Sequence, residues 1–318
     1  MWLTITLLFV GIVLILFGAD KLTDGAIGLA RRFNISEIVI GLTIVAFGTS
    51  LPEFVASFTS SLKGVDGLSV GNIIGSNIFN ILMIVGCSAL FAPVQISKST
   101  ISKDIPYTIL ATLVMIVVSL DLELDGTGNA NFISRTDGLL MLGFFSIFLF
   151  YTFSIAQNKE NNIIYQSSPM SYIRIFLYVV FGLASLILGG NLFVDAASKI
   201  ALNLGVSETV VGLTIVATGT SLPELATSII AARKGSSAIA IGNVIGSNIF
   251  NIFFVTGFCA TIRPMSVNGI SYTDLGVLIL SALMFWCFSY TKRTIERWEG
   301  GIMVVLYLIY IGSLVYNA

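Results

Sequence analysis

Hydrophobic residues run through this chain in long blocks that are separated by short polar segments. Ten blocks are long and apolar enough to be helices that cross about 30 Å of hydrocarbon, and they lack the ten-residue alternation of a membrane β-barrel. They cover residues 2–30, 37–62, 68–91, 105–120, 135–156, 172–201, 208–233, 238–261, 272–290 and 299–316. The pattern predicts an all-α membrane protein with ten transmembrane helices.

The second half of the chain repeats the first, at a distance of 171 residues that needs no gap from the first to the third predicted helix of each half. Residues 41–46 and 212–217 share the sequence GLTIVA, and residues 75–81 and 246–252 share GSNIFNI. Each half holds five predicted helices, an odd number, so the two halves must be inverted, as in many secondary transporters. The resulting division is a first repeat at 1–157 with its motif at 41–81, a cytoplasmic linker at 158–171, and a second repeat at 172–318 with its motif at 212–252.

Basic residues collect on one side of the predicted membrane. With the N-terminus outside, the outer side holds Lys63, Arg135, Lys199 and Arg263, and the inner side holds Arg31, Arg32, Lys98, Lys103, Lys159, Arg174, Arg233, Lys234, Lys292, Arg293 and Arg297. Cytoplasmic loops carry the excess of Lys and Arg. We therefore expect a multi-pass protein of the cell membrane, in contact with the lipid bilayer, with both termini outside.

Composition narrows the function. The chain is 56% hydrophobic and 10% charged, with a net charge of −1 and a mean hydropathy of +0.96. This composition is far more apolar than that of soluble proteins. It has no basic cluster for nucleic acid and no histidine, the commonest metal ligand and general base. The cysteines Cys87, Cys259 and Cys287 lie singly in apolar segments, so we interpret them as buried thiols. These features predict that the protein is not an enzyme and uses no cofactor.

The phrase GTSLPE occurs twice inside predicted spans, at residues 48–53 and 219–224. Proline removes a helical hydrogen bond from the carbonyl four residues earlier, here Gly48 or Gly219. Such breaks survive at membrane depth only where they line a cavity, and an ionisable residue there is a functional hypothesis by default. We interpret Glu53 and Glu224, with their Thr and Ser neighbours, as an oxygen site for a hard cation such as Ca²⁺.

A second polar edge lies on the following helix of each repeat. Asn72, Ser76 and Asn80 are four residues apart and share one helix face, and Asn243, Ser247 and Asn251 repeat the pattern. The nearby glycine pairs indicate close helix packing. Interhelical hydrogen bonding and ion contact both remain open for four further residues, which are Ser57, Ser228, Asn77 and Asn248.

Two other acidic features have structural interpretations. Asp24 lies three residues after Lys21, which favours a local ion pair over a gating role. The acidic run at 121–126 resembles the start of an EF-hand loop, but Phe132 occupies the twelfth position, where that loop needs a bidentate Glu. We interpret the run as a solvated turn.

The doubled motif, GTSLPE followed by GNIIGSNIFN or GNVIGSNIFN, resembles the Ca²⁺/cation antiporter superfamily, and especially its prokaryotic sodium/calcium exchangers, over the whole chain. The resemblance implies the sodium/calcium exchanger fold, in which helices 1 and 6 slide over an eight-helix core. It also implies Na⁺/Ca²⁺ antiport by alternating access. The ion ligands that it implies are Glu53, Glu224, Thr49, Thr220, Ser50, Ser221, Ser76, Ser247, Asn80 and Asn251, with the carbonyls of Ala46 and Ala217.

One position departs from several such exchangers, including the K⁺-dependent branch. They carry Asp where this chain has Asn251. The departure argues against K⁺ cotransport and leaves the site with two carboxylates.

The charge of the site suggests how transport is coupled. Two ionised glutamates neutralise one Ca²⁺ or two Na⁺, and a third Na⁺ held by neutral oxygens would make exchange electrogenic. A proton could replace Na⁺, which leaves H⁺/Ca²⁺ antiport as an alternative. A cation channel is the weaker alternative, because channels usually build filters by oligomeric symmetry, whereas an inverted repeat encloses a site within one chain. A monomer should therefore suffice; the oligomeric state stays open.

Overall fold

The computed structural model describes residues 2–126, 131–157, 170–205 and 217–317. In these residues, eight helical segments are long and apolar enough to cross a membrane, and a bent pair of helices makes a ninth. The spans built from one helix each are α1 (Trp2–Phe33), α9 (Arg135–Gln157), α10 (Tyr172–Asn203), α16 (Tyr272–Tyr290) and α17 (Arg297–Asn317). The all-α membrane class that the hydrophobic pattern predicts is confirmed.

Three further spans include π-helical segments. They are α5 (Asp66–Ile78), η2 (Phe79–Val85) and α6 (Gly86–Phe91); η3 (Thr100–Asp104) and α7 (Ile105–Val118); and α14 (Ser237–Ile249), η6 (Phe250–Thr256) and α15 (Gly257–Ile262). The span predicted to begin at residue 105 thus begins at Thr100, because η3 continues the helix before α7.

The bent span joins α2 (Glu37–Ile40), η1 (Gly41–Val45) and α3 (Ala46–Thr49) to α4 (Leu51–Leu62) at an angle of 47°. Its repeat-related counterpart is described only in part, as α12 (Ala217–Gly219) and α13 (Leu222–Arg233). The start of the predicted helix 208–233, the first five residues of the motif 212–252 and most of the linker 158–171 lie outside the described residues.

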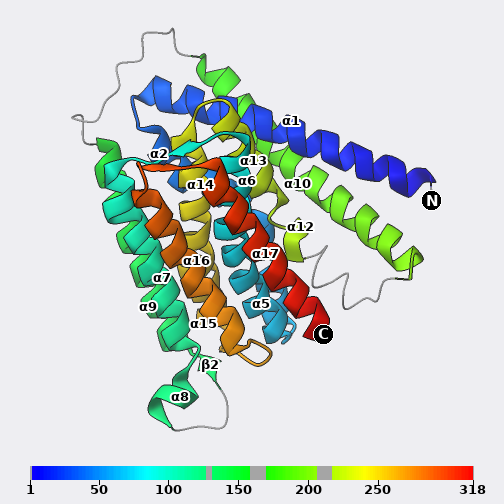
Figure 1. The fold of residues 1–318 in the computed structure, drawn as a ribbon, viewed down its shortest axis with the longest axis vertical. Coiled ribbons are helices and arrows are strands. Elements are labelled where there is room, and N and C mark those ends of the chain that lie inside the picture. The colour runs from blue at the N-terminus through cyan, green and yellow to red at the C-terminus, as the bar shows by residue number, and fades with distance from the viewer. Residues whose placement is uncertain (1, 127–130, 158–169, 206–216, 318) are drawn as a thin grey trace.

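Helices α1 and α10 form an antiparallel pair that crosses the rest of the molecule obliquely (Figure 1). Glycines allow the backbones to touch at two crossed points. A Cβ added to Gly11 would lie 2.8 Å from the Gly189 carbonyl oxygen, and one added to Gly18 would lie 2.7 Å from the Gly182 carbonyl oxygen. Small residues are what permit such close approach between membrane helices.

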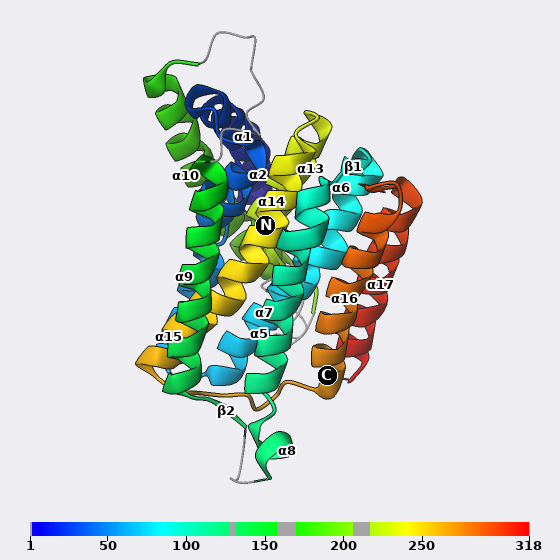
Figure 2. The same cartoon turned by 90° about the vertical axis from the view of Figure 1, so that its left-hand side faces the viewer.

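The remaining helices form an upright bundle around the two spans that contain η2 and η6 (Figure 2). Two short ladders tie its opposite ends: β1 (Val94–Gln95) pairs with β4 (Thr294–Ile295), and β2 (Phe132–Ile133) pairs with β3 (Met265–Ser266), both antiparallel. We call the end with β2, β3 and the α4–α5 turn the Lys63 end. The opposite end, with β1, β4 and the turn after α13, is the Lys234 end.

Candidate ion-binding site

Each broken helix is interrupted at a serine. Ser50 (φ −85°, ψ 6°) separates α3 from α4, and Ser221 (φ −90°, ψ 7°) precedes α13. The prolines of the motif lie in the first turn of α4 and of α13, where a missing N–H costs no hydrogen bond. Glu53 and Glu224 therefore lie in the first turn of a new helix, where a carboxylate is favoured by the helix dipole.

The two carboxylates are buried and are joined across the repeats by reciprocal hydrogen bonds. Glu53 is 1% exposed and Glu224 is fully buried. The Ser50 hydroxyl donates to Glu224 Oε1 at 2.9 Å, and the Ser221 hydroxyl donates to Glu53 Oε1 at 2.8 Å. The second oxygen of each carboxylate, Oε2, is buried and has no hydrogen-bond partner in the described part of the chain.

The second polar edge lies beside these carboxylates. Ser76 Oγ is 3.2 Å from Ser221 Oγ, and Asn80 Nδ2 donates to Asn248 Oδ1 at 3.1 Å. Other buried atoms here have no partner within the described ranges: Ser247 Oγ, Asn80 Oδ1 and both side-chain polar atoms of Asn251. Because an unpaired buried polar group costs about 1–3 kcal/mol, the unpaired oxygens among these atoms fit a site that is completed by a cation.

The remaining predicted ligands lie along the same breaks. The Thr49 hydroxyl is within hydrogen-bonding distance of the Val45 and Ala46 carbonyls, at 3.0 and 3.3 Å, and of Asn243 Oδ1, at 3.1 Å. The Ala46 carbonyl also accepts the Ser50 N–H at 3.0 Å. Thr220 lines a cavity that is described below. For Ala217, the structure gives only its place at the start of α12.

In each repeat, one asparagine holds the broken helix against the next helix. Asn72 Nδ2 donates to Ser57 Oγ at 2.9 Å, and Asn243 Nδ2 donates to Ser228 Oγ at 3.0 Å. Each amide also lies 3.4 Å from the carbonyl of the motif glutamate in its own repeat. The sequence left two roles open for Ser57 and Ser228, interhelical hydrogen bonding and ion contact. In the structure both form interhelical hydrogen bonds. Asn248 also bonds between helices, whereas Asn77 donates to Ile73 O of its own helix.

The contact between Thr49 and Asn243 was not predicted. The constant repeat distance relates equivalent residues of the two halves, but it does not say which residues face one another. The π-helical segments also lack a sequence signal, although η2 and η6 contain Asn80 and Asn251. π-Turns are rare and frequently occur at functional sites.

A cavity of about 640 Å³ extends from the Lys63 end into the bundle. Thr59 and Ser60 in the last turn of α4, and Gly67 and Leu68 in the first turn of α5, line its outer part. It reaches Asn72, Gly75 and Thr220. The cavity therefore leads from one end of the bundle to the broken helices.

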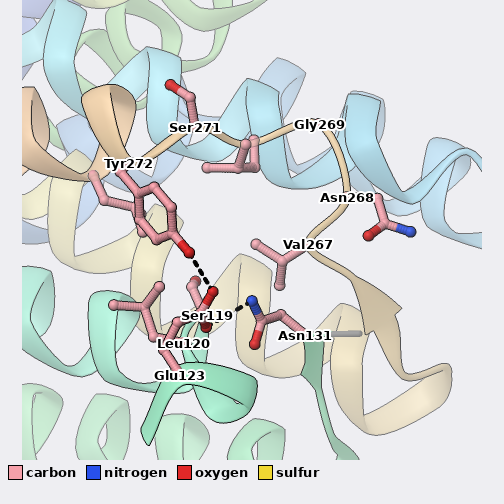
Figure 3. Close-up of a pocket in the computed structure, with 11 residues that line it drawn as sticks. Ser119, Leu120, Glu123, Asn131, Val267, Asn268, Gly269, Ser271 and Tyr272 are labelled. Atoms are coloured by element: carbon pink, nitrogen blue, oxygen red, sulfur yellow. Dashed lines mark hydrogen bonds between the residues drawn. The ribbon is translucent and has the colours of Figure 1, made fainter. Parts of the chain in front are cut away.

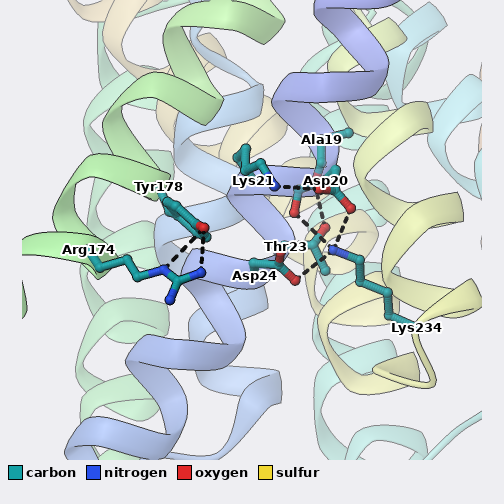
Figure 4. A network of polar contacts seen from close by, with 8 residues as sticks. All are labelled: Ala19, Asp20, Lys21, Thr23, Asp24, Arg174, Tyr178 and Lys234. Atoms are coloured by element: carbon teal, nitrogen blue, oxygen red, sulfur yellow. Dashed lines mark hydrogen bonds and ion pairs between the residues drawn. The ribbon is translucent and has the colours of Figure 1, made fainter. Parts of the chain in front are cut away.

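At the Lys234 end, an ion-pair network joins α1 to the turn after α13 (Figure 4). Lys234 Nζ lies 2.7 Å from Asp20 Oδ1 and 2.6 Å from Asp24 Oδ1, both on α1. Lys21 pairs with Asp20 at 3.0 Å. The predicted Lys21–Asp24 pair is therefore wrong. A spacing of three residues would allow Lys21 to contact Asp24, but Lys234, which is distant in sequence, pairs with Asp24 instead.

The acidic turn lies on the surface at the Lys63 end, as helix α8 (Asp121–Asp125), beside a pocket of about 270 Å³ (Figure 3). Glu123 accepts hydrogen bonds from the Tyr272 hydroxyl and from Asn131 Nδ2. These donors, Tyr272 foremost, lower the pKa of Glu123. The exposure of Glu123 agrees with the prediction of a solvated turn.

The ligand atoms define the chemistry that the site can support. The residues that the structure describes contain no group of three or more His, Cys, Asp or Glu side chains suited to holding a metal. The site instead combines two carboxylates with neutral hydroxyl, amide and carbonyl oxygens. Such a set suits reversible binding of hard cations rather than a tightly held transition metal.

Comparison with known proteins places this geometry in a family. The sequence model described as "Sodium/calcium exchanger protein" matches residues 3–154 and 174–316. The chain belongs to the sodium/calcium exchanger family. It is 37% identical over 313 residues to the putative antiporter CaxA of Alkalimonas amylolytica, with 95% of each chain covered. It is 30% identical to the sodium/calcium exchanger MaX1 of Methanosarcina acetivorans, with 98% of each covered.

Solved structures of the sodium-calcium exchanger NCX_Mj share the fold. One of them matches with a TM-score of 0.85 and 34% identity, over 98% of this chain and 99% of that one. The members of the family are exchangers rather than enzymes, so this chain is a membrane antiporter of the cation/Ca²⁺ type.

Proposed function

We propose that this exchanger moves Ca²⁺ in one direction and Na⁺ in the other by alternating access to one site between Glu53 and Glu224. The observation that carries the proposal is the reciprocal pair of Ser–Glu hydrogen bonds, 2.8 and 2.9 Å long, which joins two buried carboxylates. Each carboxylate keeps one oxygen without a protein partner in the described ranges. Both repeats thus contribute equally to one pair of charges.

Charge balance supplies the coupling. With both carboxylates ionised, the site carries −2, which one Ca²⁺ or two Na⁺ would neutralise, and uncompensated charge at this depth is costly. Either load therefore excludes the other. A third Na⁺ would be held by neutral oxygens of Thr, Ser and backbone carbonyls, which leaves the loaded site at +1 and makes exchange electrogenic.

We assign the remaining ligands by their positions around the carboxylates. Thr49 and Thr220 would add oxygen to the shared central site, and Ser50, Ser76, Ser221 and Ser247, with the carbonyls of Ala46 and Ala217, would hold flanking Na⁺. Asn80 and Asn251 would supply neutral amide oxygens. Asn251 has no described protein partner for either polar atom, and it places no third charge beside the two glutamates.

We further propose ten spans in two inverted repeats. Two sets of crossed contacts support this arrangement, because adding 171 to one residue of each contact gives a residue of the other: Gly11–Gly189 with Gly18–Gly182, and Ser50–Glu224 with Ser221–Glu53. The two β ladders lie at opposite ends of the bundle, and β1 and β3 are 171 residues apart. The basic residues collect at the Lys234 end, so that end would face the cytoplasm and both termini would lie outside in the cell membrane. Since one chain supplies both halves of the site, a monomer would suffice.

Proton coupling is the second candidate, because a buried carboxylate can carry a proton in place of a sodium ion. Counterflow in proteoliposomes separates the two, with Na⁺, K⁺ and H⁺ gradients imposed one at a time and ⁴⁵Ca²⁺ uptake as the readout. We expect uptake with the Na⁺ gradient alone. Uptake driven only by the H⁺ gradient would replace Na⁺ by H⁺ in the proposal, and flux without any ion on the opposite side would indicate a channel.

A further inference from the structure

Two lysines occupy equivalent turns at opposite ends of the molecule, 171 residues apart. Lys63 follows α4 with φ −79° and ψ −6°, and Lys234 follows α13 with φ −78° and ψ 0°. A glycine with φ +78°, Gly64 or Gly235, comes next in both cases. The two turns therefore present their lysines in the same way.

Their surroundings differ. Lys234 pairs with Asp20 and Asp24 of α1 and also donates to the Asp20 carbonyl at 3.0 Å. The repeat-related partners of Lys63 on α10 would be Asn191 and Asp195. Both Lys63 and Asp195 are exposed, and neither forms an ion pair with another described residue.

The helix packing shows the same difference. Helix α1 lies along α13, whereas α10 packs much less closely against α4. The cavity of about 640 Å³ starts at the last turn of α4, next to Lys63. The ion pairs that are formed thus lie at the end opposite the cavity, and the pair that is not formed lies beside the cavity.

We propose that these lysines form two alternating latches on the α1–α10 pair. In the described state Lys234 holds α1 through Asp20 and Asp24 and closes the Lys234 end. In the opposite state the Lys234 ion pairs break, and Lys63 forms an ion pair with Asp195 of α10 and closes the Lys63 end. The inference rests on the proposed alternating access, and it names the charged contacts that are exchanged when the pair moves.

Cysteine cross-linking tests the unmade latch directly. In a background with Cys87, Cys259 and Cys287 replaced by Ala, the pair Lys63→Cys with Asp195→Cys should form a disulfide in membranes. Adding Lys234→Gln should raise its rate about three- to tenfold, because partly exposed ion pairs bias a two-state equilibrium by about that factor. Absence of the disulfide with and without Lys234→Gln would overturn the proposal. The pair Asp24→Cys with Lys234→Cys is the positive control for the method.

Labelling of the cavity gives an independent readout. A cysteine at Thr59, which lines the cavity, should react about three- to tenfold more slowly with a membrane-impermeant maleimide when Lys234 is Gln. Lys234→Arg, which keeps the charge, should restore the rate. Lys292→Gln is the matched control, since this lysine pairs only with Glu296 among the described residues. An equal effect of Lys292→Gln would refute the latch.

Neither readout requires transport. Failure of Na⁺-driven ⁴⁵Ca²⁺ uptake with normal cross-linking would count against the proposed function, and normal uptake without cross-linking would count against the latch alone.

Discussion

Replacing Glu53 by Gln removes a charge from the site while leaving its shape unchanged. The amide oxygen of Gln can still accept the hydrogen bond that Ser221 donates at 2.8 Å, so the broken helices should keep their contact. In the proposed site the buried charge pair is the glutamate and the bound Ca²⁺, and removing one partner of such a pair costs about 3–5 kcal/mol. Since each 1.4 kcal/mol is tenfold in Kd, Ca²⁺ binding should weaken roughly 10²- to 10⁴-fold. The symmetric variant Glu224→Gln should behave alike.

Ser221→Ala provides the contrast for Ca²⁺ binding, because it keeps both charges and removes only the hydroxyl that bonds Glu53 and that we assign to a flanking Na⁺. A hydrogen bond to a charged group is worth about 1.5–3 kcal/mol, so the loss should be roughly 10- to 100-fold. Glu123→Gln changes an exposed carboxylate remote from the site and should leave binding unchanged. The measurements are Ca²⁺ titration by calorimetry in detergent and Na⁺-dependent ⁴⁵Ca²⁺ uptake in proteoliposomes.

The reasoning fails on either of two results. Exchange at the wild-type rate by Glu53→Gln or Glu224→Gln would show that the carboxylates do not bind the transported ions. A loss in Ser221→Ala as large as in Glu53→Gln would show that the arrangement of the broken helices, rather than the charge, carries the affinity.

Three further predictions concern the α1–α10 interface, a contact beside the site and the surface pocket at α8. Gly18→Ala would place a Cβ 2.7 Å from a backbone carbonyl oxygen of α10. It should lower the stability by about 1–3 kcal/mol, which a lower Tm would show. Gly143→Ala is the control, because open space surrounds Gly143, and it should not lower the Tm. Asn243→Ala removes the donor to Ser228 and should cost about 1–3 kcal/mol of stability, with a smaller loss of Ca²⁺ affinity than the glutamate variants show. Tyr272→Phe removes the main donor that lowers the pKa of Glu123, so that pKa should rise towards its ordinary value in a carboxyl NMR titration.

The sequence anticipated much of the fold because lipid restricts the choices. An apolar block of spanning length is a helix, and the repeated GTSLPE phrase located both breaks, at Ser50 and Ser221. The sequence also singled out Glu53 and Glu224 as ionisable residues inside predicted spans, and the structure shows that both are buried; their role as ion ligands is our proposal. It did not reveal the Thr49–Asn243 contact, the π-helical segments or the partner of Asp24. These depend on how distant helices face one another, which neither spacing nor composition records.

The crossed glycine contacts between α1 and α10 have a thermodynamic consequence. Gly11 meets Gly189 and Gly18 meets Gly182, so exchanging the two helices end for end reproduces nearly the same backbone interface. If this pair is the moving part, its internal energy is nearly equal at both ends of its travel. The α1–α10 interface itself then contributes little to the preference between the two states, which is left to the contacts of this pair with the rest of the bundle, such as the Lys234 ion pairs.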